Sequence, residues 1–315
     1  PKPGPTQVLI RIRASGLCFT DIHLSQGKVI PLTFPAVLGH EPVGEVVELG
    51  SAVTMAKVGD RVGTNSLQRG CGRCEWCQRG KELYCENAVW LMVHQYGSHA
   101  EYMLAEARAL YLLPENLSFE QAAPLLCAGN TVWSGFREAN PLPADRVAVV
   151  GIGGLGHLAV QYAKAAGHTV IAMTRSEDKK KLARELGADE VLSDGNALKQ
   201  AGGADIILST ANSYSVAVDA MIGLRPEGRL VVMGVQEEDM ILPERLVFPQ
   251  MIVNRQKIIA SQQNGREFQH EALQIAAAGK VKVYTEAYEL AEVQRAVERV
   301  AAGKARFRAV FVNAT

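Results

Sequence analysis

Residues 147–157 constrain the fold of this chain more than any other stretch. They form an apolar, valine-rich strand pattern that runs into G-x-G-x-x-G and then into an alanine-rich helical pattern. The turn contains Gly151, Gly153, Gly154, Leu155 and Gly156. In such a unit the first glycine permits a tight turn, the second lets the backbone approach a pyrophosphate, and the third lets helix and strand pack closely. We predict that a dinucleotide binds here; the alternative is a turn whose glycines serve packing alone.

Strand and helix patterns alternate on both sides of this turn. The predicted strands are 146–150, 169–173, 190–192, 205–208, 229–233 and 257–260, and the predicted helices are 155–166, 179–186, 216–222 and 243–254. This repeated order predicts an α/β fold with a doubly wound parallel sheet that is covered on both faces.

The flanking segments have a different character. Short strand patterns such as 8–12 and 43–49 precede the α/β segment and predict a partly open β-barrel. After about residue 265 come helix patterns at 268–278 and 290–302 and a last strand at 309–312. We therefore predict two domains, one formed by 128–264 and the other by 1–127 together with 265–315.

Composition excludes several classes of protein. The chain has 315 residues, of which 48% are hydrophobic and 21% charged, a balance typical of a soluble globular protein. Its 33 basic residues are matched by 33 acidic ones, so binding driven by neutralisation of phosphates is disfavoured. We expect a cytoplasmic protein with neither nucleic acid nor membrane as a partner.

The end of the second α/β strand bears on which dinucleotide binds. A site for NAD usually places a carboxylate there to accept a hydrogen bond from the ribose 2′-OH. This chain instead has Thr174, Arg175 and Ser176, with Lys179 one helical turn later. A cation can pair with a 2′-phosphate, so NADP(H) is preferred and NAD(H) remains open. The alternative is that these cations belong to a solvated helix face.

Four of the six cysteines lie close together, at Cys71, Cys74, Cys77 and Cys85. Four thiolates on a short, glycine-containing loop can surround one zinc ion tetrahedrally and leave no open position. This spacing predicts a structural zinc site. A redox function for the C-x2-C pair would leave Cys71 and Cys85 unexplained.

The other two cysteines, Cys18 and Cys127, are isolated in the sequence, as is the adjacent pair His40 and Glu41. Residues of these types can bind a second zinc. Taken one at a time, however, each is more often a buried thiol or a satisfied histidine than a ligand, so composition and spacing alone favour that alternative.

Together the motifs carry a resemblance. Residues 16–23, 39–44 and 124–132, the four-cysteine loop and the glycine-rich turn resemble, in family order, the zinc-dependent medium-chain alcohol dehydrogenase family, and most closely its bacterial and cinnamyl-alcohol-dehydrogenase-like, NADP-preferring branch. The resemblance implies a Rossmann domain, a GroES-like β-barrel catalytic domain, and an N-terminal segment that precedes Pro1 in relatives. It also implies two zinc ions per chain, hydride transfer between a small alcohol or aldehyde and the cofactor, and a homodimer or homotetramer.

Residue roles follow from the same resemblance. It implies a catalytic zinc on Cys18, His40 and Cys127, with Glu41 as an occasional ligand. Other implied roles are orientation of His40 by Asp21, a proton relay through Thr20 and His23, a nicotinamide contact by Thr131 and a pyrophosphate contact by Arg308. Phe19 is a departure, because the family often has a phosphate-binding His or Arg there. Trp90, Leu91 and Trp133 are candidates for the substrate pocket, with core packing as the alternative.

Two other functions compete with an alcohol dehydrogenase. One is a zinc-independent quinone or enoyl reductase of the same superfamily, which would need none of Cys18, His40 and Cys127. The other is a non-enzymatic zinc-knuckle binding module, which would need a basic and aromatic surface around the cysteine loop. That loop carries Trp76 and several basic residues, but its glutamates dilute the charge.

Overall fold

The fold is described from a computed structural model, which describes residues 1–234, 238–263 and 265–313. The chain divides into two compact units. The first comprises Pro1–Cys127, Gly265–Ala277 and Val283–Thr315, and the second comprises Ala128–Asn264 and Ala278–Lys282. The second unit thus takes a short segment that the sequence had grouped with the first. The Gln161 side chain binds this segment, donating to the carbonyl of Lys282 (2.9 Å) and accepting from its amide (2.8 Å).

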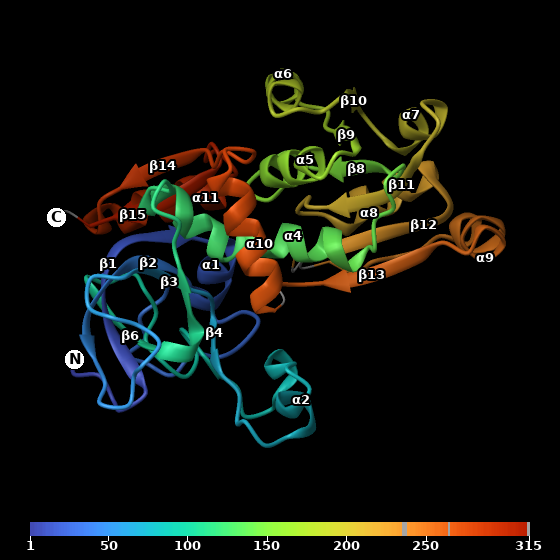
Figure 1. Ribbon diagram of the computed structural model, residues 1–315. Coiled ribbons are helices and arrows are strands. Elements are labelled where there is room, and N and C mark those ends of the chain that lie inside the picture. The colour runs from blue at the N-terminus through green and yellow to red at the C-terminus, as the bar shows by residue number, and fades with distance from the viewer. Residues whose placement is uncertain (235–237, 264, 314–315) are drawn as a thin grey trace. The chain divides into compact units, whose positions relative to one another are not determined.

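The second unit is built on a six-stranded sheet in the order β10-β9-β8-β11-β12-β13, with every pair parallel. Its strands are β8 (Arg146–Val150), β9 (Thr169–Met173), β10 (Glu190–Leu192), β11 (Ala204–Ser209), β12 (Leu224–Met233) and β13 (Lys257–Ser261). The predicted doubly wound parallel sheet is confirmed (Figure 1).

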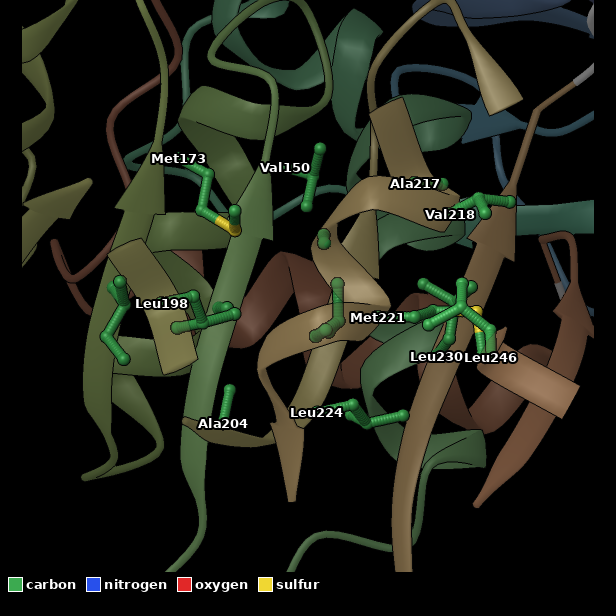
Figure 2. Packing of buried hydrophobic residues seen from close by; sticks show 14 residues of the cluster. Val150, Met173, Leu198, Ala204, Ala217, Val218, Met221, Leu224, Leu230 and Leu246 are labelled. Atoms are coloured by element: carbon green, nitrogen blue, oxygen red, sulfur yellow. The ribbon is translucent and has the colours of Figure 1, made fainter. Parts of the chain in front are cut away.

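Helices precede and connect these strands, and all but α9 bury side chains in this unit. They are α4 (Ala128–Glu138), α5 (Gly156–Ala165), α6 (Glu177–Glu185), α7 (Gly195–Gln200), α8 (Tyr214–Ala220), η4 (Met221–Gly223), η5 (Leu246–Met251) and α9 (Ile252–Asn254). Figure 2 shows Val150 and Leu230 from the strands packed with Leu198 and Met221 from the helical side. Burial of such side chains on the sheet is what holds this unit together.

Two helices in this unit were not predicted, and one predicted as continuous is interrupted. The missed helix α4 contains two glycines and β-branched residues, which weaken its helical pattern. The missed helix α7 is short and depends on its N-cap, where the Asp194 carboxylate accepts from the amide of Ala197 at 2.9 Å. The predicted helix 243–254 is interrupted at Phe248, whose backbone is extended because Pro249 follows it.

The first unit is built on a seven-stranded sheet in the order β14-β15-β1-β2-β3-β7, with β6 also on β1. The strands are β1 (Gln7–Leu17), β2 (Glu41–Leu49), β3 (Arg61–Thr64), β6 (Tyr102–Glu106), β7 (Leu110–Leu112), β14 (Thr285–Tyr288) and β15 (Arg308–Val312). The long strand β1 pairs with β2, with β6 through its first half, and with β15 through its second half. The expected β-rich domain is confirmed.

Short helices and a separate loop complete the first unit. The helices are α1 (Phe19–Ser25), α2 (Glu75–Gln78), η1 (Glu82–Tyr84), η2 (Ala107–Ala109), α3 (Phe119–Ala122), η3 (Ala123–Leu126), α10 (Arg266–Ala277), η6 (Leu290–Glu292) and α11 (Val293–Ala301). The loop with α2 leaves the sheet through the two-stranded ribbon of β4 (Leu67–Arg69) and β5 (Val89–Trp90), and projects from it in Figure 1. Across the described residues, no helix combines the length and hydropathy needed to cross a membrane.

Candidate metal centres and cofactor site

Four metal-ligating side chains meet inside the first unit, although they are far apart in the sequence. Donor atoms of Cys18, His40, Glu41 and Cys127 all lie within 4.8 Å of one another, and His40 Nε2 is 3.3 Å from Cys127 Sγ. Cys18, His40 and Glu41 are buried and Cys127 is half-buried. The four residues that the resemblance grouped are thus neighbours in space.

The Asp21 carboxylate connects the segments that carry these donors. Its Oδ2 accepts a hydrogen bond from the amide of Cys18 at 2.8 Å. Its Oδ1 accepts from the amide of Gly39 at 2.9 Å and lies 3.3 Å from His40 Nδ1. An Nδ1–H···carboxylate contact fixes the imidazole tautomer that leaves Nε2 free to bind a metal.

Local structure explains how each donor reaches this point. Cys18 is the N-cap of α1, directly after β1, and Glu41 is the first residue of β2. Cys127 follows η3, whose Leu125 carbonyl accepts a hydrogen bond from the buried side chain of Gln269 at 3.0 Å. Each donor therefore lies at the end of an ordered element, where neighbouring backbone contacts fix its position.

Glu41 is fully buried and forms an ion pair with Arg308 at the start of β15. Burial raises the pKa of Glu41 to about 7, so the charge of Arg308 offsets the cost of burial only in part. The same ion pair raises the pKa of Arg308 against the effect of its own burial. Gly16 makes room for the carboxylate, because a Cβ at Gly16 would lie 1.8 Å from Glu41 Oε2.

The donor set fits a zinc ion. A hydrogen bond from Cys127 lowers the pKa of Cys18 well below its ordinary value although burial opposes this, and the thiolate is the form that binds metals. Among the described residues, the buried Glu41 Oε2 has no hydrogen-bond partner, and such an orphaned oxygen in a group of metal ligands points to a cation. Two thiols and one imidazole are the ligands of zinc sites that keep an open position.

The two residues of the implied proton relay lie on α1. Thr20 is exposed, and its Oγ1 lies 3.7 Å from Cys18 Sγ. His23 lies three residues further along the helix and is half-buried. Residues three apart on a helix share a face, so this geometry is compatible with a relay, whose operation stays a prediction.

The second donor group is the four-cysteine loop, where the sulfur atoms also lie within 4.8 Å of one another. Amides of the loop donate to the sulfurs, from Cys71 to Cys85 (3.3 Å) and from Cys74 to Cys71 (3.4 Å). Such bonds, above all from the Arg73 amide, lower the pKa of Cys71 to about 6. Gly70 permits the close turn, because a Cβ there would lie 2.5 Å from Cys77 Sγ. None of these cysteines forms a disulfide, and the set fits a closed zinc site.

The glycine-rich turn of the second unit has the geometry that dinucleotide binding requires. Gly151 has a φ of +86°, which favours glycine, and a Cβ at Gly156 would lie 1.9 Å from the Gly151 carbonyl oxygen. By contrast, a Cβ at Gly153 would meet nothing within 4 Å, so the space above the middle of the turn is open. Gly154 and Leu155 complete the turn before α5. The glycines thus differ in role as a pyrophosphate-binding turn requires.

The remaining predicted cofactor residues are distributed as follows. Thr174 and Arg175 follow β9, with Arg175 exposed, and the Thr174 hydroxyl accepts from the amide of Ser176 at 3.3 Å. Ser176 is the N-cap of α6, and Lys179 lies half-buried in its first turn. Thr131 lies half-buried in α4 of the second unit, whereas Arg308 is buried in the first unit beside Glu41. The phosphate contact of Arg308 stays a prediction.

Two pocket candidates are core residues. Leu91 is fully buried in the hydrophobic core of the first unit. The Trp133 ring packs against Phe136 and Tyr162 in the second unit, with both ring centroids at 5.5 Å. Trp90 remains half-buried at the end of β5. For Leu91 and Trp133 the structure thus favours the packing alternative.

Comparison with known proteins decides the family. Residues 4–115 match the alcohol dehydrogenase GroES-like domain, and residues 154–278 match the zinc-binding dehydrogenase model. An alcohol dehydrogenase of Geobacillus stearothermophilus is 38% identical over 98% of this chain and 93% of its own length. The chain belongs to the zinc-dependent medium-chain alcohol dehydrogenase family.

Solved structures of related proteins have the same fold. A cinnamyl alcohol dehydrogenase from Sorghum bicolor superposes with a TM-score of 0.90 at 31% identity, covering 99% of this chain and 91% of that one. The CAD from Helicobacter pylori, complexed with NADP(H), gives a TM-score of 0.89 at 27% identity, with 98% and 91% covered. The expected family and fold are therefore confirmed, whereas the NADP-preferring branch stays a prediction.

Two residues that were not predicted from the sequence support these sites from a distance. Thr210, directly after β11, donates through its hydroxyl to the carbonyl of Gly151 at 2.7 Å and so fixes the glycine-rich turn. The sequence signal for Thr210 is that it is a polar residue directly after a buried parallel strand. Gln269 gave no signal, because its partner Leu125 lies 144 positions away.

Gly16→Ala should destabilise the first unit and loosen the donor group. The new methyl would overlap Glu41 Oε2, and relief of such overpacking costs about 1–3 kcal/mol in the free energy of unfolding. Urea unfolding of the variant measures this loss. The control is Gly4→Ala, where the nearest atom is the movable end of the Gln7 side chain at 3.2 Å. Equal stability of the two variants would contradict the close approach at Gly16.

Proposed function

We propose that this chain is a zinc-dependent alcohol dehydrogenase, which interconverts alcohols and aldehydes by hydride transfer to or from NADP(H), with NAD(H) as the less favoured cofactor. The observation that carries the proposal is the meeting of Cys18, His40 and Cys127 at one buried point. Three nitrogen and sulfur ligands leave a coordination position for substrate, which four cysteines would not. We further propose a second, structural zinc on the four-cysteine loop, and a homodimer or homotetramer as the assembly.

A zinc ion held by these residues supplies a Lewis acid, which lowers the pKa of an alcohol or polarises an aldehyde carbonyl. The protein orients the ligands and moves the proton. Asp21 holds the imidazole of His40 through Nδ1, which leaves Nε2 free for the metal. The exposed Thr20 hydroxyl takes the alcohol proton and passes it toward His23, on the same face of α1.

The preference for NADP(H) rests on the end of β9. No carboxylate stands at Thr174 to repel a 2′-phosphate, and the exposed Arg175 can donate to one. Lys179 adds a second cation in the first turn of α6. The NADP(H) complex of the related Helicobacter pylori protein supports this preference.

The competing functions account for less of the structure. A zinc-independent reductase has no use for the buried group of Cys18, His40 and Cys127. A nucleic-acid-binding knuckle would need a free aromatic face, but the Trp76 ring is contacted by Tyr84 at 5.3 Å and covered by the Arg79 guanidinium at 5.1 Å. Arg79 is also paired with Glu75, which reduces its availability for phosphate.

Replacing Cys127 by Ser should remove turnover while the fold remains. We expect reduction of an aldehyde panel with NADPH to fall by more than about 100-fold, since loss of an outer-shell partner alone costs about 10- to 100-fold. Metal analysis should show one zinc per chain in the variant and two in the unmodified protein. Undiminished turnover in the variant, or in protein stripped of zinc by a chelator, would support the zinc-independent reductase instead.

Replacing Arg175 by Gln should weaken binding of NADPH selectively. Loss of a charge-assisted hydrogen bond, worth about 1.5–3 kcal/mol, should raise the KM for NADPH about tenfold or more. The KM for NADH should change less than about twofold, since this cofactor lacks the 2′-phosphate. Arg184→Gln is the matched control, because Arg184 is an exposed cation in the last turn of α6, away from the end of β9. Equal effects of Arg175→Gln on both cofactors would refute the phosphate contact.

A further inference from the structure

Three polar side chains form a small cluster in the interior of the first unit. The Ser15 hydroxyl, on β1, lies 2.7 Å from the hydroxyl of Ser98 and 2.8 Å from Nδ1 of His99. Ser15 and Ser98 are buried, with exposed fractions of 1% and 0%. The cluster joins residues more than 80 positions apart in the sequence and includes none of the proposed metal ligands.

This cluster lies against the segment that leads into His40. The backbone amide of Gly97 donates to the carbonyl of Val37 (2.7 Å), and the backbone amide of Ser98 donates to the carbonyl of Gly39 (2.9 Å). A Cβ at Gly39, where φ is +99°, would lie 2.6 Å from Ser98 Oγ and 2.7 Å from His99 Nδ1. Polar atoms of the cluster therefore occupy the space directly over the Gly39 backbone.

Gly39 links this cluster to the metal-binding histidine. Its amide donates to Asp21 Oδ1 at 2.9 Å, and the same oxygen lies 3.3 Å from His40 Nδ1. A shift of Gly39 would therefore change both the hydrogen bond to Asp21 and the direction from which Asp21 contacts the imidazole. Asp21 thus accepts from the Gly39 amide and the Ser98 amide donates to the Gly39 carbonyl, while Ser98 Oγ and His99 Nδ1 occupy the place of a Cβ.

The His99 side chain contributes to the cluster through its hydrogen bond to Ser15. Burial lowers the pKa of His99, so the ring is neutral and acts through hydrogen bonding rather than charge. Its Nε2 is buried without a hydrogen-bond partner in the described part of the chain, which has a cost. The ring also packs edge-on against Phe311 at a centroid distance of 4.8 Å. A phenylalanine would fill the same space without that cost, but it could not bind Ser15.

We propose that Ser15, Ser98 and His99 form a positioning cluster for the catalytic metal, which fixes the Gly39 backbone so that Asp21 orients His40. This inference rests on the proposed zinc site. The three residues act through Gly39 and Asp21 and touch neither metal nor substrate.

Two substitutions of His99 separate positioning from packing. His99→Phe keeps the ring and its volume but removes Nδ1, whereas His99→Asn keeps a polar atom near the Nδ1 position and gives up volume. If His99 positions the metal site through Nδ1, His99→Asn should be the milder change. If the ring only fills space, His99→Phe should be the milder one. The control is His168→Phe in the second unit, because the His168 ring also makes one hydrogen bond through Nδ1 (3.0 Å) and one edge contact with a phenylalanine (5.3 Å).

The measurement is the rate at which purified holoenzyme releases zinc to a chromogenic chelator, with the catalytic-site phase identified by its absence in Cys127→Ser protein. We expect His99→Phe to accelerate this phase about tenfold, in the range typical of lost outer-shell partners. His99→Asn should stay near the unmodified rate, and neither change should affect the phase of the four-cysteine loop. The inference is overturned if Asn accelerates release more than Phe, if both leave it unchanged, or if His168→Phe has the same effect. Absence of that phase from the unmodified protein would refute the proposed zinc site itself.

Discussion

The candidate metal site in the first unit depends on one buried carboxylate. Asp21 accepts hydrogen bonds from the amides of Cys18 and Gly39 and faces the ring of His40. It therefore ties the start of α1 to the segment before β2 and sets the position of two of the three proposed zinc ligands. Because the Asp21 carboxylate is buried, moving these amides away would leave its charge without hydrogen-bond partners. The free-energy cost of that loss opposes small displacements of the two segments.

A second buried charge pair supports the same region from the sheet. Strand β1 lies between β2 and β15, and the ion pair of Glu41 with Arg308 joins the two flanking strands. Register places Gly16 of β1 opposite Glu41, and only a residue without a side chain leaves room for that carboxylate. The sheet of the first unit thus provides the framework on which the donor group is built.

Sequence reasoning recovered features with a local signature and missed those created by packing. The parallel strands and the glycine-rich turn carry their pattern within a few residues, so their types were predictable. The four-cysteine loop was equally local, whereas Cys18 and Cys127 were grouped only through the family resemblance. The partnership of Ser15 with His99 could not be predicted, since neither has a motif and they meet only when β1 and the segment after β5 have folded.

Cys18, His40 and Cys127 are proposed to hold a catalytic zinc. Anomalous diffraction from crystals of the protein, recorded on both sides of the zinc absorption edge, tests this proposal most directly. We expect two zinc peaks, one of them about 2.3 Å from the sulfurs of Cys18 and Cys127 and about 2.0–2.1 Å from His40 Nε2. A single peak in the four-cysteine loop, with Cys18, His40 and Cys127 ordered around no metal, would contradict the proposal.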